Sequence, residues 1–385
     1  MRDGVRIFDA DTHVRCAAEA IEPFLDSATR AKVGDLEPHM VPIKIGQAGE
    51  RRQPPFKHYF RFSRGEGWGG STPRFLGEAE PRANTEREFQ QFMGSRFPTE
   101  GANEDPNIRL RDMDEEGTDV HLMVPTGPND HQDPSVEMGF IQANHRFLDN
   151  YCSADPARLK SMIVVTARSI EDSVKEIKAW GDKRWSIGVF PHLPLDYPLD
   201  HPDLNPIWKT ATDFGLPVVH HSFAAGYPGY RDLWSNPFLG RLSSHPWGAM
   251  RAVGAFLAGG VMDRYPGIKF VVLESGFGWL PFWARRMDDQ VDYMGYVAEG
   301  LKKKPSEYML SGQFAASIVL HEGSDMVRMC NELLGDDVLM FGSDYPHAES
   351  RFPDSVNLVQ GWDNITEKSK KKLFWDNAVR IFGEP

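Results

Sequence analysis

Acidic and imidazole side chains recur at the ends of apolar stretches of the sequence. Asp11 and His13 close the first of these stretches, and His221 closes another. Glu274 and Asp344 stand at the ends of two more. Carboxylate and imidazole groups are common ligands of divalent metal ions, and both can transfer protons. These residues therefore indicate a metal-dependent enzyme, provided that the fold brings the stretches together.

The first stretch carries two candidate ligands. Alternate side chains of an extended strand point to the same face, so Asp9, Asp11 and His13 would share a face if the chain is extended there. Asp11 and His13 could then bind one ion. For an isolated Asp-x-His sequence, the ordinary alternative is a hydrogen-bonded pair without a metal.

Two adjacent histidines, His220 and His221, end the stretch at residues 216–221. Neighbouring side chains of a strand point in opposite directions, so only one of them can face a shared site. Burying both rings without partners would be costly. We expect His221 to be the ligand, with His220 as the alternative.

Two carboxylates follow later apolar stretches. Glu274 ends residues 268–274 and would be partly desolvated, which raises a carboxyl pKa, whereas a nearby metal lowers it. Its alternative role is a salt bridge to Arg285 or Arg286. Asp344 follows a glycine and a serine, whose small side chains allow the backbone to approach a ligand closely. Its alternative role is a helix N-cap.

Eight strand-like apolar stretches position these residues, at residues 5–8, 118–124, 159–165, 185–190, 216–221, 268–274, 314–320 and 338–342. Helix-like segments alternate with them, for example at residues 169–181, 204–214, 247–264 and 325–334. Such alternation predicts a parallel sheet, and eight strands favour a closed (β/α)8 TIM barrel over an open doubly wound sheet. Active sites of such barrels lie at the C-terminal ends of the strands, so the candidate ligands would meet at one mouth.

One segment, at about residues 26–107, interrupts the alternation and is rich in Gly, Pro, Arg and aromatic residues. We expect a single domain over residues 1–385 with this segment as an insertion after the first strand. Long loops are usually functional or disordered, and the aromatic content argues against plain disorder. A substrate lid, a subunit contact and a packed surface excursion all remain open.

The composition limits the class of protein. With 41% hydrophobic and 25% charged residues, the 385-residue chain can bury a core, and no apolar run approaches the roughly 18 residues of a membrane span. The net charge of −12 opposes nucleic-acid binding. The first residues lack the features of a signal peptide, so we expect a cytoplasmic location. Three isolated cysteines leave imidazole and carboxylate as metal ligands.

Together, the motifs resemble the amidohydrolase superfamily, in the branch that contains aminocarboxymuconate-semialdehyde decarboxylase and related aromatic-acid decarboxylases and hydrolases. The resemblance spans most of the chain. Its motifs are specific in combination and lie at residues 9–13, 109–117, 155–158, 216–221, 265–266, 274–281, 341–347 and 377–378.

The resemblance implies one divalent metal ion, held here by Asp11, His13, His221 and Asp344. Zinc is the usual ion in this family. The decarboxylase that names the branch has His-x-His on its first strand, and the oxygen of Asp11 makes manganese the alternative. Glu274 stands where the family carries a catalytic histidine. No lysine ends the stretch at residues 185–190, so a centre with two metals is not expected.

We expect hydrolysis of a small aromatic or acidic carbonyl compound. Asp344 and Glu274 would orient a metal-bound water, and together with His221 they form the expected catalytic group. The alternative reaction is non-oxidative decarboxylation of an aromatic or unsaturated acid. The non-enzymatic alternative is a barrel that serves as a binding or scaffold protein and has lost its catalytic activity.

Further basic residues are candidates for substrate binding. His192 and His245 could contact the substrate, and Arg61 or Arg64 of the insertion could bind an acidic group. We expect a small-molecule substrate, neither a nucleic acid nor a membrane as partner, and a homo-oligomer in which the aromatic insertion pairs the subunits.

Overall fold

The computed structural model of the protein describes residues 2, 4–43, 55–62, 98–127, 131–194, 197–221, 237–297 and 300–385. Within these residues one eight-stranded parallel sheet forms, with its strands in chain order. The strands are β1 (Phe8–Val14), β4 (Val120–Pro125), β5 (Leu159–Thr166), β6 (Ser186–His192), β7 (Val218–His221), β8 (Phe270–Leu273), β9 (Phe314–Ser317) and β10 (Leu339–Met340).

The sheet closes where β1 meets the segment that leaves β10. The Ala10 N–H donates to the carbonyl of Phe341 at 2.9 Å, and the Asp344 N–H donates to the carbonyl of Asp11 at 2.8 Å. These hydrogen bonds continue the ladder across the two edge strands, so neither edge is left open. The predicted (β/α)8 barrel is confirmed.

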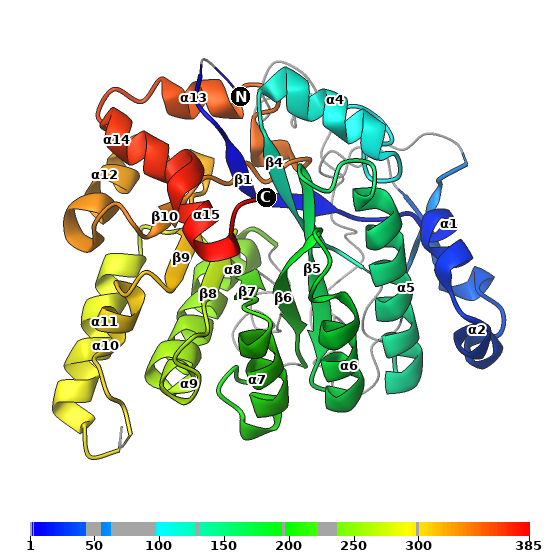
Figure 1. The fold of residues 1–385 in the computed structure, drawn as a ribbon, viewed down its shortest axis with the longest axis horizontal. Helices are drawn as coiled ribbons and strands as arrows, with labels where there is room; N and C mark the ends of the chain where they lie inside the picture. The colour runs from blue at the N-terminus through cyan, green and yellow to red at the C-terminus, as the bar shows by residue number, and fades with distance from the viewer. Residues whose placement is uncertain are drawn as a thin grey trace.

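Helices follow the strands and cover the outside of the barrel (Figure 1). The longer ones are α4 (Pro106–Glu116), α5 (Pro134–Cys152), α6 (Ile170–Trp180), α7 (Asn205–Asp213), α8 (Pro237–Val253), α10 (Leu280–Met294) and α12 (Gly323–Leu334). The shorter ones are α1 (Ala18–Ile21), α2 (Ser27–Val33), α9 (Val261–Arg264), α11 (Pro305–Met309), α13 (Ser355–Gln360), α14 (Glu367–Lys371) and α15 (Asn377–Phe382). No helix among the described residues is both long enough and apolar enough to cross a bilayer.

The period-two pattern of the strands divides the core into two layers. Val219 and Val271 belong to a buried cluster of inward-facing strand residues, whereas their neighbours Val218 and Val272 belong to a larger cluster shared with the helices. Both faces of β7 and β8 are therefore apolar, as expected for a parallel sheet covered by helices.

Some predicted element bounds differ from the structure. The first strand begins at Phe8 and runs through the polar residues that follow, because these pair with β4 and with the segment after β10. The predicted helix at residues 247–264 begins earlier, in α8, and is interrupted by a π-turn at Gly254–Ala258. Gly260, at φ +75°, then starts α9 anew.

The described part of the predicted insertion lies between β1 and α4. It contains α2 and an antiparallel pair of short strands, β2 (Met40–Pro42) and β3 (His58–Phe60). The rings of Phe60 and Phe62 pack on Phe140 of α5, with centroids 5.1 and 4.7 Å away. The described part of the insertion therefore packs against the helices of the barrel. Residues 44–54 and 63–97, including Arg64, lie outside the described residues.

Asp9 does not share a face with Asp11, and this part of the sequence prediction is wrong. The β1–β4 pairing shifts register between Asp9 and Thr12, so the alternation breaks there. Asp9 joins Glu116 of α4 and His121 of β4 in a separate buried group. Its carboxylate accepts the Ser343 N–H at 2.9 Å and supports the barrel seam.

We predict that Glu116→Gln flattens the fall in stability with rising pH. Burial raises the pKa of Glu116 to about 8 from 4.5, and the neighbouring Asp9 adds to the effect. The unfolded chain releases this proton above pH 4.5, whereas the folded protein keeps it to about pH 8. The contribution of Glu116 is thus lost as pH rises through this window.

Urea unfolding across that window provides the measurement. The matched control is Glu115→Gln, at an exposed neighbour on the same helix, which should keep the slope of the unmodified protein. An unchanged slope in the Glu116 variant would contradict the assignment of this proton.

Candidate metal centre

The C-terminal mouth of the barrel gathers the polar residues of four strand ends. Asp11 and His13 lie in β1, and His221 is the last residue of β7. Glu274 follows β8 directly, and Asp344 follows β10 after three further residues. All five side chains are buried. The fold therefore brings together the four expected ligands, Asp11, His13, His221 and Asp344, and places Glu274 beside them.

Asp11 lies between the two histidines. Its Oδ1 atom is 3.8 Å from Nε2 of His13 and 3.7 Å from Nε2 of His221. The two rings meet edge to face, with centroids 4.8 Å apart. The three ligand atoms lie close enough to one another to surround a single ion.

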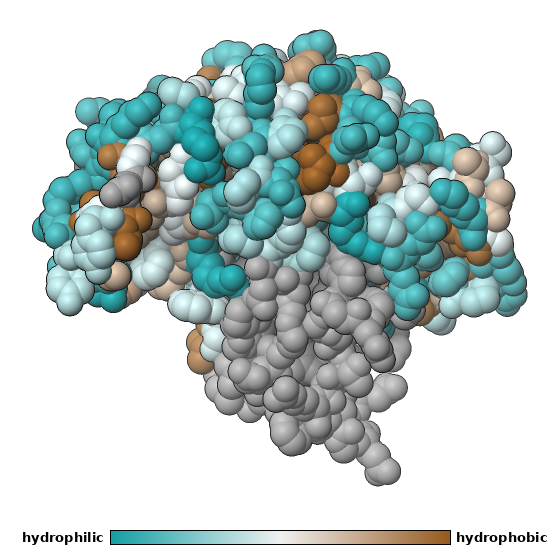
Figure 2. Space-filling view, turned by 90° about the horizontal axis from the view of Figure 1, so that it is seen from below, coloured by the Kyte–Doolittle hydropathy of each residue, from teal (hydrophilic) through white to brown (hydrophobic). Residues whose placement is uncertain are grey.

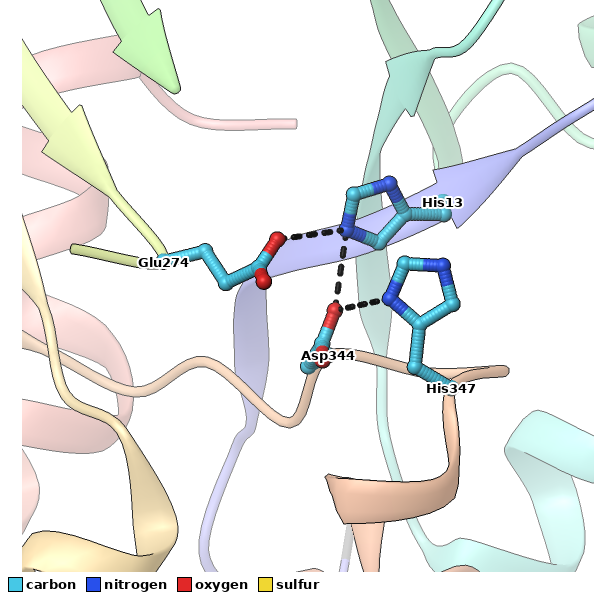
Figure 3. A group of neighbouring side chains, drawn as sticks. All are labelled: His13, Glu274, Asp344 and His347. Carbon is cyan, nitrogen blue, oxygen red and sulfur yellow. Dashed lines mark hydrogen bonds and ion pairs between the residues drawn. The ribbon is translucent and has the colours of Figure 1, made fainter. Parts of the chain in front are cut away.

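A second group of possible ligands shares His13 with the first. Nε2 of His13 lies 2.9 Å from Oδ1 of Asp344 and 3.7 Å from Oε2 of Glu274. The same Asp344 oxygen is 2.7 Å from Nδ1 of His347 (Figure 3). On the other side, Oε2 of Glu274 is 3.0 Å from Nε2 of His221. His13 therefore connects the two halves of the site.

The backbone at two of these carboxylates is in the left-handed region. Glu274 has φ +45° and Asp344 has φ +67°, values that non-glycine residues rarely adopt. Such conformations persist only where the surroundings impose them, and they cluster at functional sites. Here each one marks the point where the chain leaves a strand and turns its carboxylate into the mouth.

Among the described residues, hydrogen-bond donors hold Asp11 through one of its two carboxylate oxygens. Its Oδ2 atom accepts the Glu274 N–H at 2.9 Å and the Ser317 hydroxyl at 3.0 Å. A Cβ atom at Gly342 would lie 2.7 Å from Cβ of Asp11, so only glycine leaves room for this side chain. The sequence analysis expected the backbone at this glycine to approach a bound ligand. In the structure it approaches the side chain of Asp11 instead.

The electrostatics of the site favour a bound cation. Burial raises the pKa of Asp11 well above its usual range, and the charges of Asp344 and Glu274 add to this. Burial also lowers the pKa of His13 to about 4, so this ring is neutral near pH 7. Carboxylates crowded beside a neutral imidazole repel one another unless a positive charge lies between them.

The residues present fit a divalent metal ion. Oδ1 of Asp11 and Oδ2 of Asp344 are buried, and neither makes a hydrogen bond with any described residue. Buried polar atoms without partners are rare and call for an explanation such as an ion. Carboxylate oxygens and imidazole nitrogens at these separations supply a donor set that divalent ions accept.

His347 is a member of the site that the sequence analysis did not single out. Its ring lies against that of His13, with centroids 4.1 Å apart. Burial would lower its pKa, but the Asp344 carboxylate raises it to about 10. The ring is therefore a cation paired with Asp344. The Asp-x-x-His spacing in the turn after β10 was the available signal.

The other predictions for single residues have mixed outcomes. The structure places His221 in the site, whereas His220 is buried outside both ligand groups, and burial lowers its pKa to about 3. Glu274 faces imidazoles, so a salt bridge to Arg285 or Arg286, both exposed on α10, is wrong.

A cavity of about 600 Å³ opens from the metal centre. Asp11, Glu274 and Asp344 line it, and the rest of the described lining combines polar side chains with the apolar Leu242, Pro246, Ile318, Val319 and Leu320. Its size and mixed lining suit a small organic molecule.

Of the predicted substrate-binding histidines, only His245 lines this cavity. Nδ1 of His245 lies 3.0 Å from the Glu274 carbonyl oxygen. His192 ends β6 and is absent from the described lining, as is the exposed Arg61.

Comparison with known proteins gives a consistent family and fold. A family model described as amidohydrolase matches residues 80–383. An amidohydrolase from Mycobacterium avium subsp. paratuberculosis K-10 is 18% identical, with a TM-score of 0.73 over 99% of this chain and 100% of that chain. A 5-carboxyvanillate decarboxylase from Sphingomonas paucimobilis is 24% identical, with a TM-score of 0.60 over 71% and 82% of the chains.

A third similar structure contains a metal and a ligand. It is a 5-carboxyvanillate decarboxylase from Novosphingobium aromaticivorans DSM 12444, complexed with manganese and 4-hydroxy-3-methoxy-5-nitrobenzoic acid. It is 18% identical, with a TM-score of 0.66 over 99% of this chain and 97% of that chain. At these identities the structures show a shared fold, whereas the family model spans most of the sequence. The chain therefore belongs to the amidohydrolase family.

Proposed function

We propose that this protein is a metal-dependent, non-oxidative decarboxylase of small aromatic acids. The sequence analysis ranked this reaction second, after hydrolysis. The observation that carries the proposal is the cavity, in which the carboxylates of Asp11, Glu274 and Asp344 lie together with an apolar surface from Leu242, Pro246 and residues 318–320. A flat ring can lie against that surface while its carboxylate points to the metal centre. Similar solved structures that act on an aromatic acid add support.

Asp11, His13, His221 and Asp344 would hold the ion, with Glu274 close to it. When bound, a divalent ion would anchor the substrate carboxylate and a neighbouring oxygen of the ring, which fixes the ring carbon beside the proton donor. Manganese is our first choice over zinc, because two carboxylates suit a harder ion and a similar structure contains manganese.

The charge of the cavity constrains the substrate. No lysine or arginine occurs in the described part of the cavity lining, where the basic side chains are His245 and His321. A substrate with several carboxylates would lack counter-charges there, since Glu322 and Glu349 also belong to the lining. We therefore expect one carboxylate at the metal centre and neutral substituents, such as hydroxyl groups, elsewhere on the ring.

Asp344 and His347 are suited to deliver the proton that the reaction needs. Decarboxylation breaks the bond between the ring carbon and the carboxylate, and the electron pair left on that carbon takes up a proton. Asp344 lines the cavity, and the protonated His347 lies 2.7 Å behind it. A proton can pass from Nδ1 of His347 to Asp344 and then to the ring carbon.

Hydrolysis is the second candidate function. Glu274 and Asp344 both face the centre, and both can accept a hydrogen bond from a water molecule between them. The two reactions share a metal requirement but differ in their products, so an assay can separate them.

We predict that His221→Ala abolishes stoichiometric metal binding, whereas His220→Ala retains it. Only His221 lies in the ligand group with Asp11 and His13. Elemental analysis after dialysis against manganese provides the measurement. The two variants differ by one position in the same strand, which controls for damage to β7. Full metal content in His221→Ala would refute the ligand assignment.

We predict that the affinity for manganese rises as the pH is raised above the ordinary carboxyl range. The pKa of Asp11 is raised by burial, so at the lower pH a proton competes with the ion for this carboxylate. Asp11→Asn should bind more weakly and with a smaller pH dependence. Titration of manganese followed by electron paramagnetic resonance measures both effects. An equal pH dependence in the two proteins would contradict this assignment.

We predict release of carbon dioxide from hydroxylated benzoic acids by the manganese-loaded protein. Asp344→Asn should lower this rate by about 100-fold or more, because the variant lacks the acidic group. His347→Gln should lower it less and shift its pH profile. His192→Ala, outside the described cavity lining, is the matched control and should keep full activity.

Amide and ester derivatives of the same acids test the second function in parallel. Cleavage of these derivatives without any release of carbon dioxide from the free acids would replace decarboxylation by hydrolysis.

A further inference from the structure

Helix α10 carries large exposed side chains along its outer face. Phe282 and Tyr293 are 62% and 78% exposed, and the charged Arg286 and Asp289 lie between them. Steps of four, three and four residues place these four side chains on one side of a helix. We refer to Phe282, Arg286, Asp289 and Tyr293 as the α10 stripe.

The opposite face of α10 is the one that packs against the rest of the protein. Leu280, Ala284 and Met287 are buried against the barrel. The exposed apolar area continues beyond the helix with Tyr296 and Val297, which are 74% and 65% exposed. Figure 2 shows brown residues at the left end of that view, where Figure 1 places α10 and α11. Clustered exposed apolar groups of this kind commonly mark an interaction surface.

The order of residues in the α10 stripe is self-complementary. Phe282 and Tyr293 lie equally far from the midpoint between residues 287 and 288, and so do Arg286 and Asp289. A two-fold axis through that midpoint, perpendicular to the helix, would run two copies of α10 antiparallel. Phe282 would then face Tyr293 of the partner subunit, and Arg286 would face Asp289 of the partner subunit.

We infer that the α10 stripe is a two-fold contact between two copies of this chain. A symmetric interface repeats each contact, so one arrangement supplies two aromatic contacts and two ion pairs. Aromatic side chains and arginine are the residues that most often carry binding energy at interfaces. The charges of the α10 stripe are complementary to those of the same helix running in the opposite direction. This favours a second copy of the chain over an unrelated partner.

The surroundings of the α10 stripe agree with this occupant. Within one chain, Arg286 and Asp289 lie 3.7 Å apart with both side chains largely exposed, so that ion pair contributes little by itself. A groove of about 340 Å³ is lined by Phe282, Arg286 and Asp289 of the α10 stripe and by neighbouring charges of both signs, including Arg285, Asp292 and Lys304. Such a groove can receive polar side chains of the partner at the rim. The inference does not rest on the proposed reaction.

Charge exchange provides the test, by sedimentation equilibrium over a wide concentration range. The unmodified protein should sediment as a dimer or a larger even assembly. Arg286→Asp places two carboxylates against each other at both symmetric contacts and should weaken association at least about tenfold. Asp289→Arg should have the same effect. The double variant R286D/D289R keeps the pair within each helix, restores both contacts and should recover association.

An equivalent exchange on another helix is the matched control. Arg328 of α12 is similarly exposed and pairs with Glu332 at 2.8 Å, so Arg328→Asp should leave the assembly unchanged. Circular dichroism of each variant checks that the fold is retained. A monomeric unmodified protein, undiminished association in Arg286→Asp, or a double variant that stays dissociated would each overturn the inference. Undiminished association would place the contact elsewhere, for instance on the insertion.

Discussion

The hydrogen bond from the Asp344 N–H to the Asp11 carbonyl is the contact on which the metal centre depends. It joins β1 to the segment after β10 and thereby connects elements more than 300 residues apart in the sequence. Without this seam the sheet would be open, and Asp344 would have no fixed position relative to His13. The same few residues close the barrel and present the ligands, so the stability of the fold and the geometry of the site are coupled.

That coupling has an electrostatic cost. Three carboxylates, from Asp11, Glu274 and Asp344, are buried at one mouth together with a neutral His13. Burying charges of one sign is unfavourable unless an opposite charge compensates them. His347 supplies positive charge beside Asp344, and His221 holds the pKa of Glu274 well below its usual range although burial would raise it. A divalent ion would compensate the carboxylates further. The buried carboxylates of the site therefore lower the stability of the metal-free protein.

Much of this arrangement could be predicted from the sequence because strands of a parallel barrel are short apolar segments whose polar termini converge at one mouth. That rule identified Asp11, His13, His221 and Asp344 without knowledge of their distances. Period-two alternation failed at Asp9, because a register shift in β1 is set by pairing with β4 and leaves no local signal. His347 was missed because its place depends on a turn. His192 and His245 could not be ranked, since loops decide which residues line the cavity.

The left-handed backbone at residues 274 and 344 limits how this centre can diverge. Glycine, asparagine and aspartate tolerate that region best, so position 344 can exchange among short polar side chains at little conformational cost. For glutamate at position 274 the same backbone geometry has a higher conformational energy, and for β-branched residues this energy would be higher still. Exchanges between imidazole and carboxylate at this position leave the backbone requirement in place. At both positions the turn of the backbone, more than the chemical group it carries, is therefore what the fold requires.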